Sequence, residues 1–177
     1  MSEDVLPLSS ALPSDALMHI LSFLDAPGLV SAFASGDQKI GSLSERDVLW
    51  KDLRRRRWEG KHNTRVFLLD EQRSAKESYR LAELDSRRKS IGRDEFCRLR
   101  WMLVYNGVPS RMGLRSFGAD GTYMSPYFGQ PCPWEIVDNC LLFSGLRLPI
   151  ERNENNWGWI VGGGSNTVYY SVDVDDN

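Results

Sequence analysis

The chain has 177 residues, of which 41% are hydrophobic, and a formal net charge of −2. This length allows one or two domains, and the hydrophobic content suffices for the core of at least one. No stretch approaches the ~18 consecutive apolar residues of a membrane helix. The acidic start Met1-Ser2-Glu3-Asp4 also lacks the basic-then-apolar order of a signal peptide. We therefore expect neither membrane insertion nor secretion, and a protein of the cytoplasm, the nucleus or both.

The net charge conceals a division along the chain. Residues 1–45 carry one base against six acids, residues 46–100 carry 17 bases against 10 acids, and residues 101–177 carry 4 bases against 8 acids. An acidic head, a basic middle and an acidic tail therefore follow one another.

Metal-ligating and catalytic side chains are sparse. The cysteines, Cys97, Cys132 and Cys140, are odd in number and form no C-x-x-C pair, which argues against a disulfide framework and a zinc site. His19 lies within a predicted helix, where we expect it to be exposed or to face a partner, and His62 lies in a basic loop. No G-x-S-x-G elbow, P-loop or H-E-x-x-H pattern occurs. We expect no catalytic residue, metal or cofactor.

The first predicted helix is marked by an apolar stripe and a start signal. Its stripe has the spacing i, i+3, i+4 and i+7 that lines one face of an α-helix, at Leu17, Ile20, Leu21 and Leu24. Pro13 fits just outside the helix, Ser14 is the predicted N-cap, and Asp15 favours the positive end of the helix dipole. That apolar face must be buried.

Further helices are expected after a break near Asp25, because Pro27 disfavours helix at the residue before it. A short second helix carries Leu29, Val30 and Phe33. Ser44 and Asp47 then form a predicted capping pair ahead of a helix bearing Val48, Leu49, Trp50 and Leu53. A cluster of roughly 40 residues is near the lower limit for folding unaided, so we expect it to pack against a neighbour.

The apolar positions of this cluster resemble the F-box pattern in order and spacing, at Leu12-Pro13, Leu17, Ile20-Leu21, Leu24, Leu29, Leu43 and Leu49-Trp50. The resemblance covers about residues 11–53 and implies docking on the Skp adaptor subunit of a Skp-cullin-F-box ubiquitin ligase, and through it on cullin. The residues implied to contact Skp or to shape the contact surface are Leu12, Pro13, Leu17, Ile20, Leu21, Leu24, Leu29 and Trp50. The alternative is an ordinary helical cluster that packs only on its own chain.

The basic middle opens with a run of four arginines, Arg54 to Arg57, followed by Trp58. Four consecutive residues sweep round a helix, so solvation of some and snorkelling of others over apolar surface is one interpretation. The others are a phosphate or acidic-ligand site, since arginine presents a planar fork, and contact with nucleic acid.

Residues 64–91 are expected to be mostly helical, with one thin apolar stripe at Ala75, Tyr79 and Ala82. Leu81 and Leu84 lie off that stripe. The segment Ser74 to Arg80 resembles a helix start that often follows an F-box.

From about Phe96 the pattern alternates with a period of two, and turn residues recur. Strands are expected at 101–105, 114–117, 122–124, 134–137, 140–143, 146–150, 157–161 and 167–172, with hairpin turns at Asp120-Gly121 and Asp138-Asn139. Pro149 implies an edge position or a bulge. The predicted fold class is α+β, with a disordered N-terminus (1–10), an F-box-like helical domain (11–58), a basic helical connector (59–95) and an antiparallel β domain (96–174), either a small barrel or a sandwich.

The β half is rich in large aromatic side chains, and those left partly exposed are suited to recognition. The loop Ser125 to Pro133 is the predicted recognition surface, and the candidate substrate-binding residues are Tyr127, Phe128, Trp157 and Trp159.

The preferred hypothesis is a non-catalytic adaptor whose F-box docks on Skp and whose β domain holds an unknown substrate protein. A second hypothesis makes the β domain a small-ligand-binding barrel or an enzyme, which would require that Trp101, Trp134, Trp157 and Trp159 leave an open pocket. A third, nucleic-acid binding through the basic middle, carries the least weight and predicts steeply salt-dependent affinity.

Overall fold

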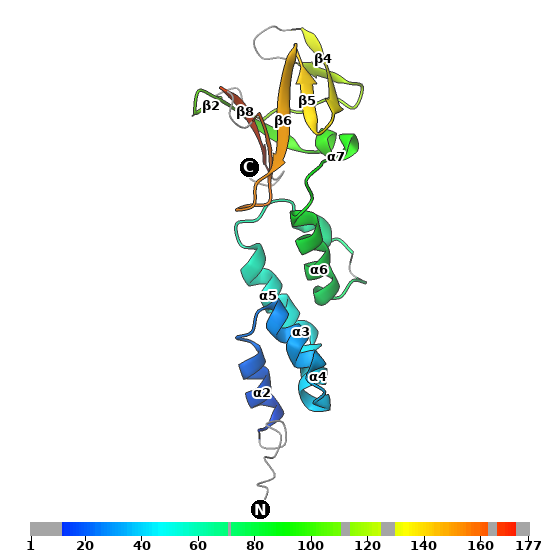
Figure 1. The fold of residues 1–177 in the computed structure, drawn as a ribbon, viewed down its shortest axis with the longest axis vertical. Coiled ribbons are helices and arrows are strands. Elements are labelled where there is room, and N and C mark those ends of the chain that lie inside the picture. Colours follow the sequence, from blue (N-terminus) through cyan, green and yellow to red (C-terminus); the bar gives the residue numbers. More distant parts are fainter. Residues whose placement is uncertain (1–11, 71, 111–113, 125–129, 163–165, 173–177) are drawn as a thin grey trace, which may run out of the picture. The chain divides into compact units, whose positions relative to one another are not determined.

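The computed structural model describes residues 12–70, 72–110, 114–124, 130–162 and 166–172. The chain divides into two compact units, a helical unit (residues 1–59 and 65–82) and a β unit (residues 60–64 and 83–177). The α+β fold class is confirmed (Figure 1). The predicted connector is shared between the two units. Helix α6 begins in the helical unit and ends in the β unit.

From residue 12 on, the described part of the helical unit contains four successive helices: α2 (Ser14–Leu21), α3 (Ala26–Ala34), α4 (Gln38–Ser44) and α5 (Asp47–Trp58). Leu17 and Leu21 lie one turn apart on α2 and are both buried. They join the core listed as Leu17, Leu21, Leu29, Leu43, Leu49, Trp50, Leu53 and Ala75. The predicted helical cluster, including the break at Asp25, is therefore confirmed.

The helix starts use different caps from those predicted. Ser14 is the first residue of α2 rather than its N-cap, because Pro13 occupies the cap position without a side-chain hydrogen bond. Asp25 caps α3 by accepting the Gly28 N–H at 2.9 Å. The predicted cap at Ser44 is also wrong. That residue ends α4 and is buried, and its carbonyl oxygen accepts the Trp50 indole N–H at 2.9 Å.

Helix α6 (Ala75–Ser86) supplies the neighbour that the helical cluster needs. Asp47 Oδ1, on the first residue of α5, accepts the backbone N–H of Ala75 at 2.7 Å. Tyr79 packs edge-on against Trp50 with ring centroids 5.8 Å apart. Ala75 and Ala82 are buried on the predicted stripe. The small cluster is thus completed by a helix from beyond the F-box-like segment.

The rest of the predicted connector is less helical than expected. It contains the 3-10 helix η1 (Arg65–Phe67) and α7 (Arg93–Arg98). Residues 68–70, 72–74 and 87–92 lie outside helices. Leu68 and Leu69 are both exposed, so no packed apolar face stabilises a helix at that point.

The described residues of the β unit form one eight-stranded antiparallel sheet. Its strands are β1 (Arg100–Tyr105), β2 (Val108–Pro109), β3 (Thr122–Met124), β4 (Pro131–Val137), β5 (Cys140–Phe143), β6 (Leu146–Arg152), β7 (Trp159–Val161) and β8 (Thr167–Val172). The order is β2-β1-β8-β7-β6-β5-β4-β3. The sheet curls into a half-barrel, which excludes the sandwich (Figure 1).

Left-handed turn residues set the hairpins. Asp138 and Asn139 both have positive φ (50° and 56°) and join β4 to β5, as predicted.

The prediction of a strand at 114–117 is wrong. Arg115 forms an isolated bridge with Trp101 of β1, whereas β3 takes β4 as its partner. The predicted turn at Asp120-Gly121 is present, but it leads from this bridging segment into β3.

Pro149 lies inside β6, where that strand changes partner. Pro149 is the last residue of β6 paired with β5, opposite Cys140, and the ladder to β7 begins at Ile150. Its carbonyl oxygen accepts the Gly162 N–H at 2.8 Å. Proline has no N–H to donate, and in β6 it stands where the hydrogen-bonded pairing with β5 ends. The strand therefore accommodates Pro149 without the predicted edge position or bulge.

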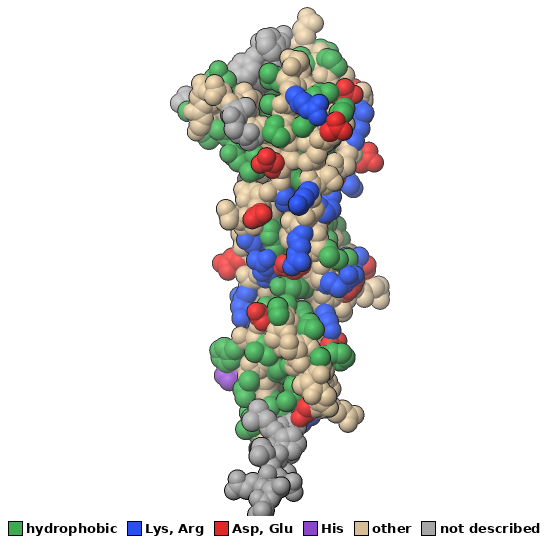
Figure 2. Space-filling model, viewed as in Figure 1, with side chains coloured by type: hydrophobic (Ala, Val, Ile, Leu, Met, Phe, Trp, Pro, Cys, Tyr) green, Lys and Arg blue, Asp and Glu red, His purple; other side chains and the backbone are tan. Residues whose placement is uncertain are grey.

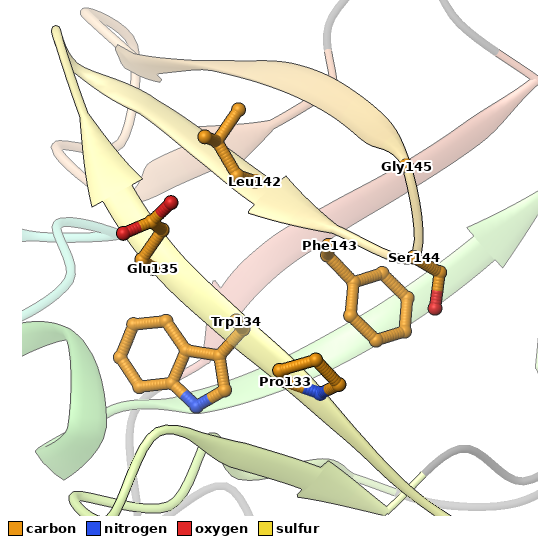
Figure 3. Close-up of a pocket in the computed structure, with 7 residues that line it drawn as sticks. All are labelled: Pro133, Trp134, Glu135, Leu142, Phe143, Ser144 and Gly145. Atoms are coloured by element: carbon orange, nitrogen blue, oxygen red, sulfur yellow. The ribbon is translucent and has the colours of Figure 1, made fainter.

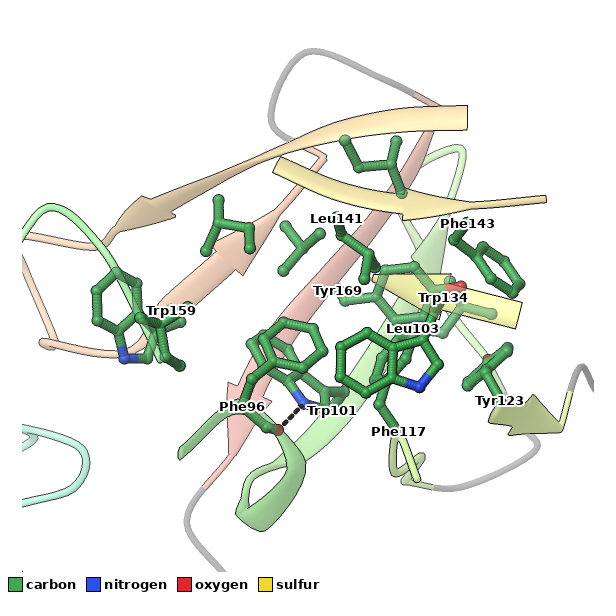
Figure 4. Packing of buried hydrophobic residues seen from close by; sticks show 14 residues of the cluster. Phe96, Trp101, Leu103, Phe117, Tyr123, Trp134, Leu141, Phe143, Trp159 and Tyr169 are labelled. Carbon is green, nitrogen blue, oxygen red and sulfur yellow. Dashed lines mark hydrogen bonds between the residues drawn. The ribbon is translucent and has the colours of Figure 1, made fainter. Parts of the chain in front are cut away.

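The concave side of the half-barrel is filled with aromatic rings (Figure 4). Phe117 lies among them, with ring-centroid distances of 4.6 Å to Tyr123, 4.9 Å to Phe96 and 5.5 Å to Trp134. The Trp101 indole N–H donates to the Phe96 carbonyl oxygen at 3.2 Å. The bridging segment at 114–117 thus brings a core residue to the middle of the sheet.

None of the helices in the described ranges is long and apolar enough to span a membrane.

Candidate functional site

Four large hydrophobic side chains of α2, α3 and the turn between them are exposed, and we call them the α2–α3 apolar surface. Their exposed fractions are 45% for Ile20, 72% for Phe23, 50% for Val30 and 55% for Phe33. Figure 2 shows hydrophobic side chains gathered over α2 and α3. Exposed apolar groups that gather in this way mark protein contacts, whereas single ones need no explanation.

The helix geometry explains why these residues face outward. On α2 the side chains of Leu17 and Leu21 pack in the core. Ile20 lies on another face of the helix and points away from the core. On α3 only Leu29 is fully buried. Val30 and Phe33 lie three residues apart and share another face. The unit is too small to cover every apolar side chain that its sequence supplies.

The residues predicted to contact a Skp adaptor divide into two groups. Leu17, Leu21, Leu29 and Trp50 are buried in the core, at 1% to 5% exposure. Pro13 and Ile20 are exposed, and Leu12 and Leu24 are half-buried. The first group shapes the surface, and only the second group can touch a partner.

Sequence reasoning named no contact role for Phe23, the most exposed member of the α2–α3 apolar surface. Phe23 lies off the i, i+3, i+4, i+7 stripe and two residues beyond the end of α2. Its ring meets His19 edge-on with centroids 5.0 Å apart, and His19 is exposed as predicted. The sequence did contain one indication of this role, because Phe23 is a large aromatic residue outside the apolar stripe that forms the core.

The β unit carries a cavity of about 340 Å³ at the turn between β5 and β6. It is lined by Pro133, Trp134, Glu135, Leu142, Phe143, Ser144 and Gly145. The rings of Trp134 and Phe143 point to one face of the β4–β5 hairpin, whereas Glu135 and Leu142 point to the other (Figure 3). Pro133 is the last residue of the segment predicted to be a recognition surface, and among the described residues of that segment it is the one in the cavity lining.

Two of the four predicted substrate-binding residues, Trp157 and Trp159, are buried. Trp157 and Trp159 are 3% and 0% exposed, so the expectation that they are partly exposed is wrong, and substrate binding by them stays a prediction. Trp159 lies in β7 among the core residues, and Lys61 covers the Trp157 ring at 5.7 Å from its centroid. Tyr127 and Phe128 lie outside the described residues. Trp101 and Trp134 are also buried, and of these four tryptophans only Trp134 lines the cavity of about 340 Å³.

Four charged side chains of the β unit form a partly buried network of ion pairs. Arg152 Nη2 lies 2.6 Å from Asp85 Oδ2, and Arg88 forms two hydrogen bonds with Glu95 (2.7 and 2.8 Å). Arg152 also stacks over the Trp159 ring at 4.5 Å from its centroid. Burial raises the pKa of Glu95, but the hydrogen bonds and charge of Arg88 outweigh burial and hold it below its ordinary value. The network joins the end of α6 to α7 and β6.

Within the described ranges, no group of three or more His, Cys, Asp or Glu side chains is arranged to hold a metal ion. Comparisons with family models, curated proteins and solved structures find no match for this chain. The functional assignment therefore depends on its own residues and their geometry.

Proposed function

We propose that this protein is a non-catalytic substrate-recognition adaptor of a Skp-cullin-F-box ubiquitin ligase. In this proposal the helical unit docks on the Skp subunit and the β unit holds the substrate protein. The adaptor acts in the cytoplasm or the nucleus, and other subunits transfer ubiquitin. The sequence resemblance at residues 11–53 gives the proposal its class.

The observation that carries the proposal is the α2–α3 apolar surface. Its members Ile20, Phe23, Val30 and Phe33 are all between 45% and 72% exposed within the stretch that resembles an F-box. A partner that covers them would remove four large apolar side chains from water, each contributing about 1.5–3 kcal/mol if fully buried. That gain offsets the cost of association better than scattered contacts would.

The filled concave side of the β unit favours a protein substrate over an internal small ligand. Phe117 and its aromatic neighbours occupy the space where a barrel would hold a ligand. The outer β4–β5 face and the cavity beside Ser144 are two features of the described residues that a substrate can reach.

The test is co-purification of the full chain with a Skp adaptor, comparing wild type with Ile20→Ala and Phe23→Ala. Both residues are exposed, so the fold should tolerate the truncations. Leu69→Ala is the matched control, because Leu69 is 78% exposed in the same unit but lies outside α2 and α3.

The proposal expects a stable wild-type complex, and each of the two variants should bind Skp on the order of 30-fold more weakly, as truncation of a central contact does. Leu69→Ala should bind like wild type, and circular dichroism should show all variants folded. Absence of a wild-type complex would refute the proposal. Equal weakening by Leu69→Ala would refute the assignment of the surface.

A further inference from the structure

The helical unit contains a second feature, a cavity of about 280 Å³ between α5, η1 and the start of α6. Its polar lining includes Asp47, Lys51, Arg54, Asp70, Arg73 and Ser78, and Phe67 and Leu68 add apolar wall. Three cations and two carboxylates therefore face one small space. Its volume is near the lower end of small-ligand sites.

Both carboxylates of the lining are already engaged. Asp47 pairs with Lys51 at 2.9 Å and accepts the Ala75 N–H at 2.7 Å. These two hydrogen bonds hold the pKa of Asp47 below its ordinary value. Asp70 pairs with Arg73 at 3.2 Å and accepts a backbone N–H two residues on at 3.1 Å. The remaining charge of the lining is the positive charge of Arg54.

The structure separates Arg54 from its neighbours in the arginine run. Arg55 pairs with Asp52 at 2.6 Å, and Arg56 pairs with the same carboxylate at 3.1 Å. Arg54 forms no ion pair with any other described residue. It lies over the Trp58 ring, 5.3 Å from the centroid, and its side chain lines the cavity. A guanidinium held over a ring can still use its N–H groups for a ligand.

A serine adds a hydroxyl to the cavity lining. Ser78 is 1% exposed and lines the cavity. A hydroxyl can donate one hydrogen bond, and an acceptor seated in the cavity can receive it.

We propose that this cavity binds a phosphate group, with Arg54 and Lys51 supplying charge and the Ser78 hydroxyl donating a hydrogen bond. Phosphate suits the lining better than a carboxylate does, because its oxygens can accept from a guanidinium fork, an ammonium group and a hydroxyl at once. This inference does not depend on the adaptor function, since Arg54 and Ser78 lie outside the α2–α3 apolar surface.

The test uses the full chain, with binding of inorganic phosphate measured by isothermal titration at constant ionic strength. O-phosphoserine, sulfate and acetate are the comparison ligands. The variants are Arg54→Gln, Ser78→Ala and, as a matched control, Arg55→Gln, which removes the same charge one residue away where the side chain is 74% exposed.

Saturable phosphate binding is expected for wild type and Arg55→Gln, with about tenfold or greater weakening in Arg54→Gln, since a hydrogen bond to a charged group is lost. Ser78→Ala should weaken phosphate binding while circular dichroism shows the variant folded. Tighter binding of O-phosphoserine than of inorganic phosphate would identify an organic phosphate as the ligand, and the reverse would identify free phosphate.

Three outcomes would overturn the proposal. They are the absence of saturable phosphate binding by wild type, equal losses in Arg54→Gln and Arg55→Gln, and acetate binding as tight as phosphate binding. Ser78→Ala keeps the proposal testable if Arg54→Gln does not fold.

Discussion

Replacing Phe117 with alanine should destabilise the β unit more than any surface change in the same segment. The ring is 1% exposed and meets six other aromatic rings, with centroid distances from 4.6 to 6.4 Å. Truncation of a buried Phe to Ala costs about 3–5 kcal/mol, and a rigid aromatic surround collapses poorly around the space left behind. With a urea m-value of about 2 kcal/mol/M, the unfolding midpoint should fall by ~2 M.

The assay is urea denaturation followed by amide hydrogen exchange at β1 and β8, which reports the β unit separately from the helices. Leu114→Ala is the control, because Leu114 lies three residues earlier and is 36% exposed. It should shift the free energy of unfolding by about 0.5 kcal/mol or less. A loss below about 1 kcal/mol in Phe117→Ala would show that this ring does not hold the half-barrel together.

The charged network gives two further predictions. Asp85→Ala should cost the β unit about 3 kcal/mol in urea denaturation, because it leaves Arg152, whose side chain is 6% exposed, without its carboxylate. Asp52→Ala, which removes an exposed partner, should change little, and equal losses would contradict the role of burial. Because Arg88 holds the pKa of Glu95 below its unfolded value, the stability that Glu95 contributes is present above about pH 4.3 and is lost as the pH falls through the lowered folded pKa. Unfolding midpoints measured from pH 6 to 3 should therefore fall less steeply in Glu95→Gln, and an unchanged slope would refute this linkage.

Local sequence signals were sufficient for the elements and for several of their boundaries. The stripe at Leu17 and Leu21 predicted α2, and Asp138-Asn139 predicted a hairpin, because periodicity and positive φ preferences act over a few residues. Caps were less predictable. Ser44 has the residue type of an N-cap, but the Trp50 indole recruits its carbonyl oxygen and burial takes its side chain into the core.

The sequence did not predict which of the candidate site residues are exposed. An apolar stripe indicates that a face is buried, but it does not say whether the partner is the same chain or another. Leu17 and Leu21 are covered by their own unit, whereas Ile20 on the same predicted stripe is 45% exposed. Trp159 was assigned to a surface because aromatic residues outnumbered the expected core, yet the curl of the sheet encloses it fully.

The sequence by itself determined the α+β class, the helical head, the meander of strands and the arginine run, since each depends on neighbours along the chain. Only the tertiary structure decided that one curled sheet replaces the sandwich, that Phe117 reaches its centre, and that Arg54 lines the cavity between α5, η1 and α6. These outcomes depend on contacts between residues far apart in sequence. Tertiary packing determines which side chains are buried in the core, and no local sequence pattern encodes that choice.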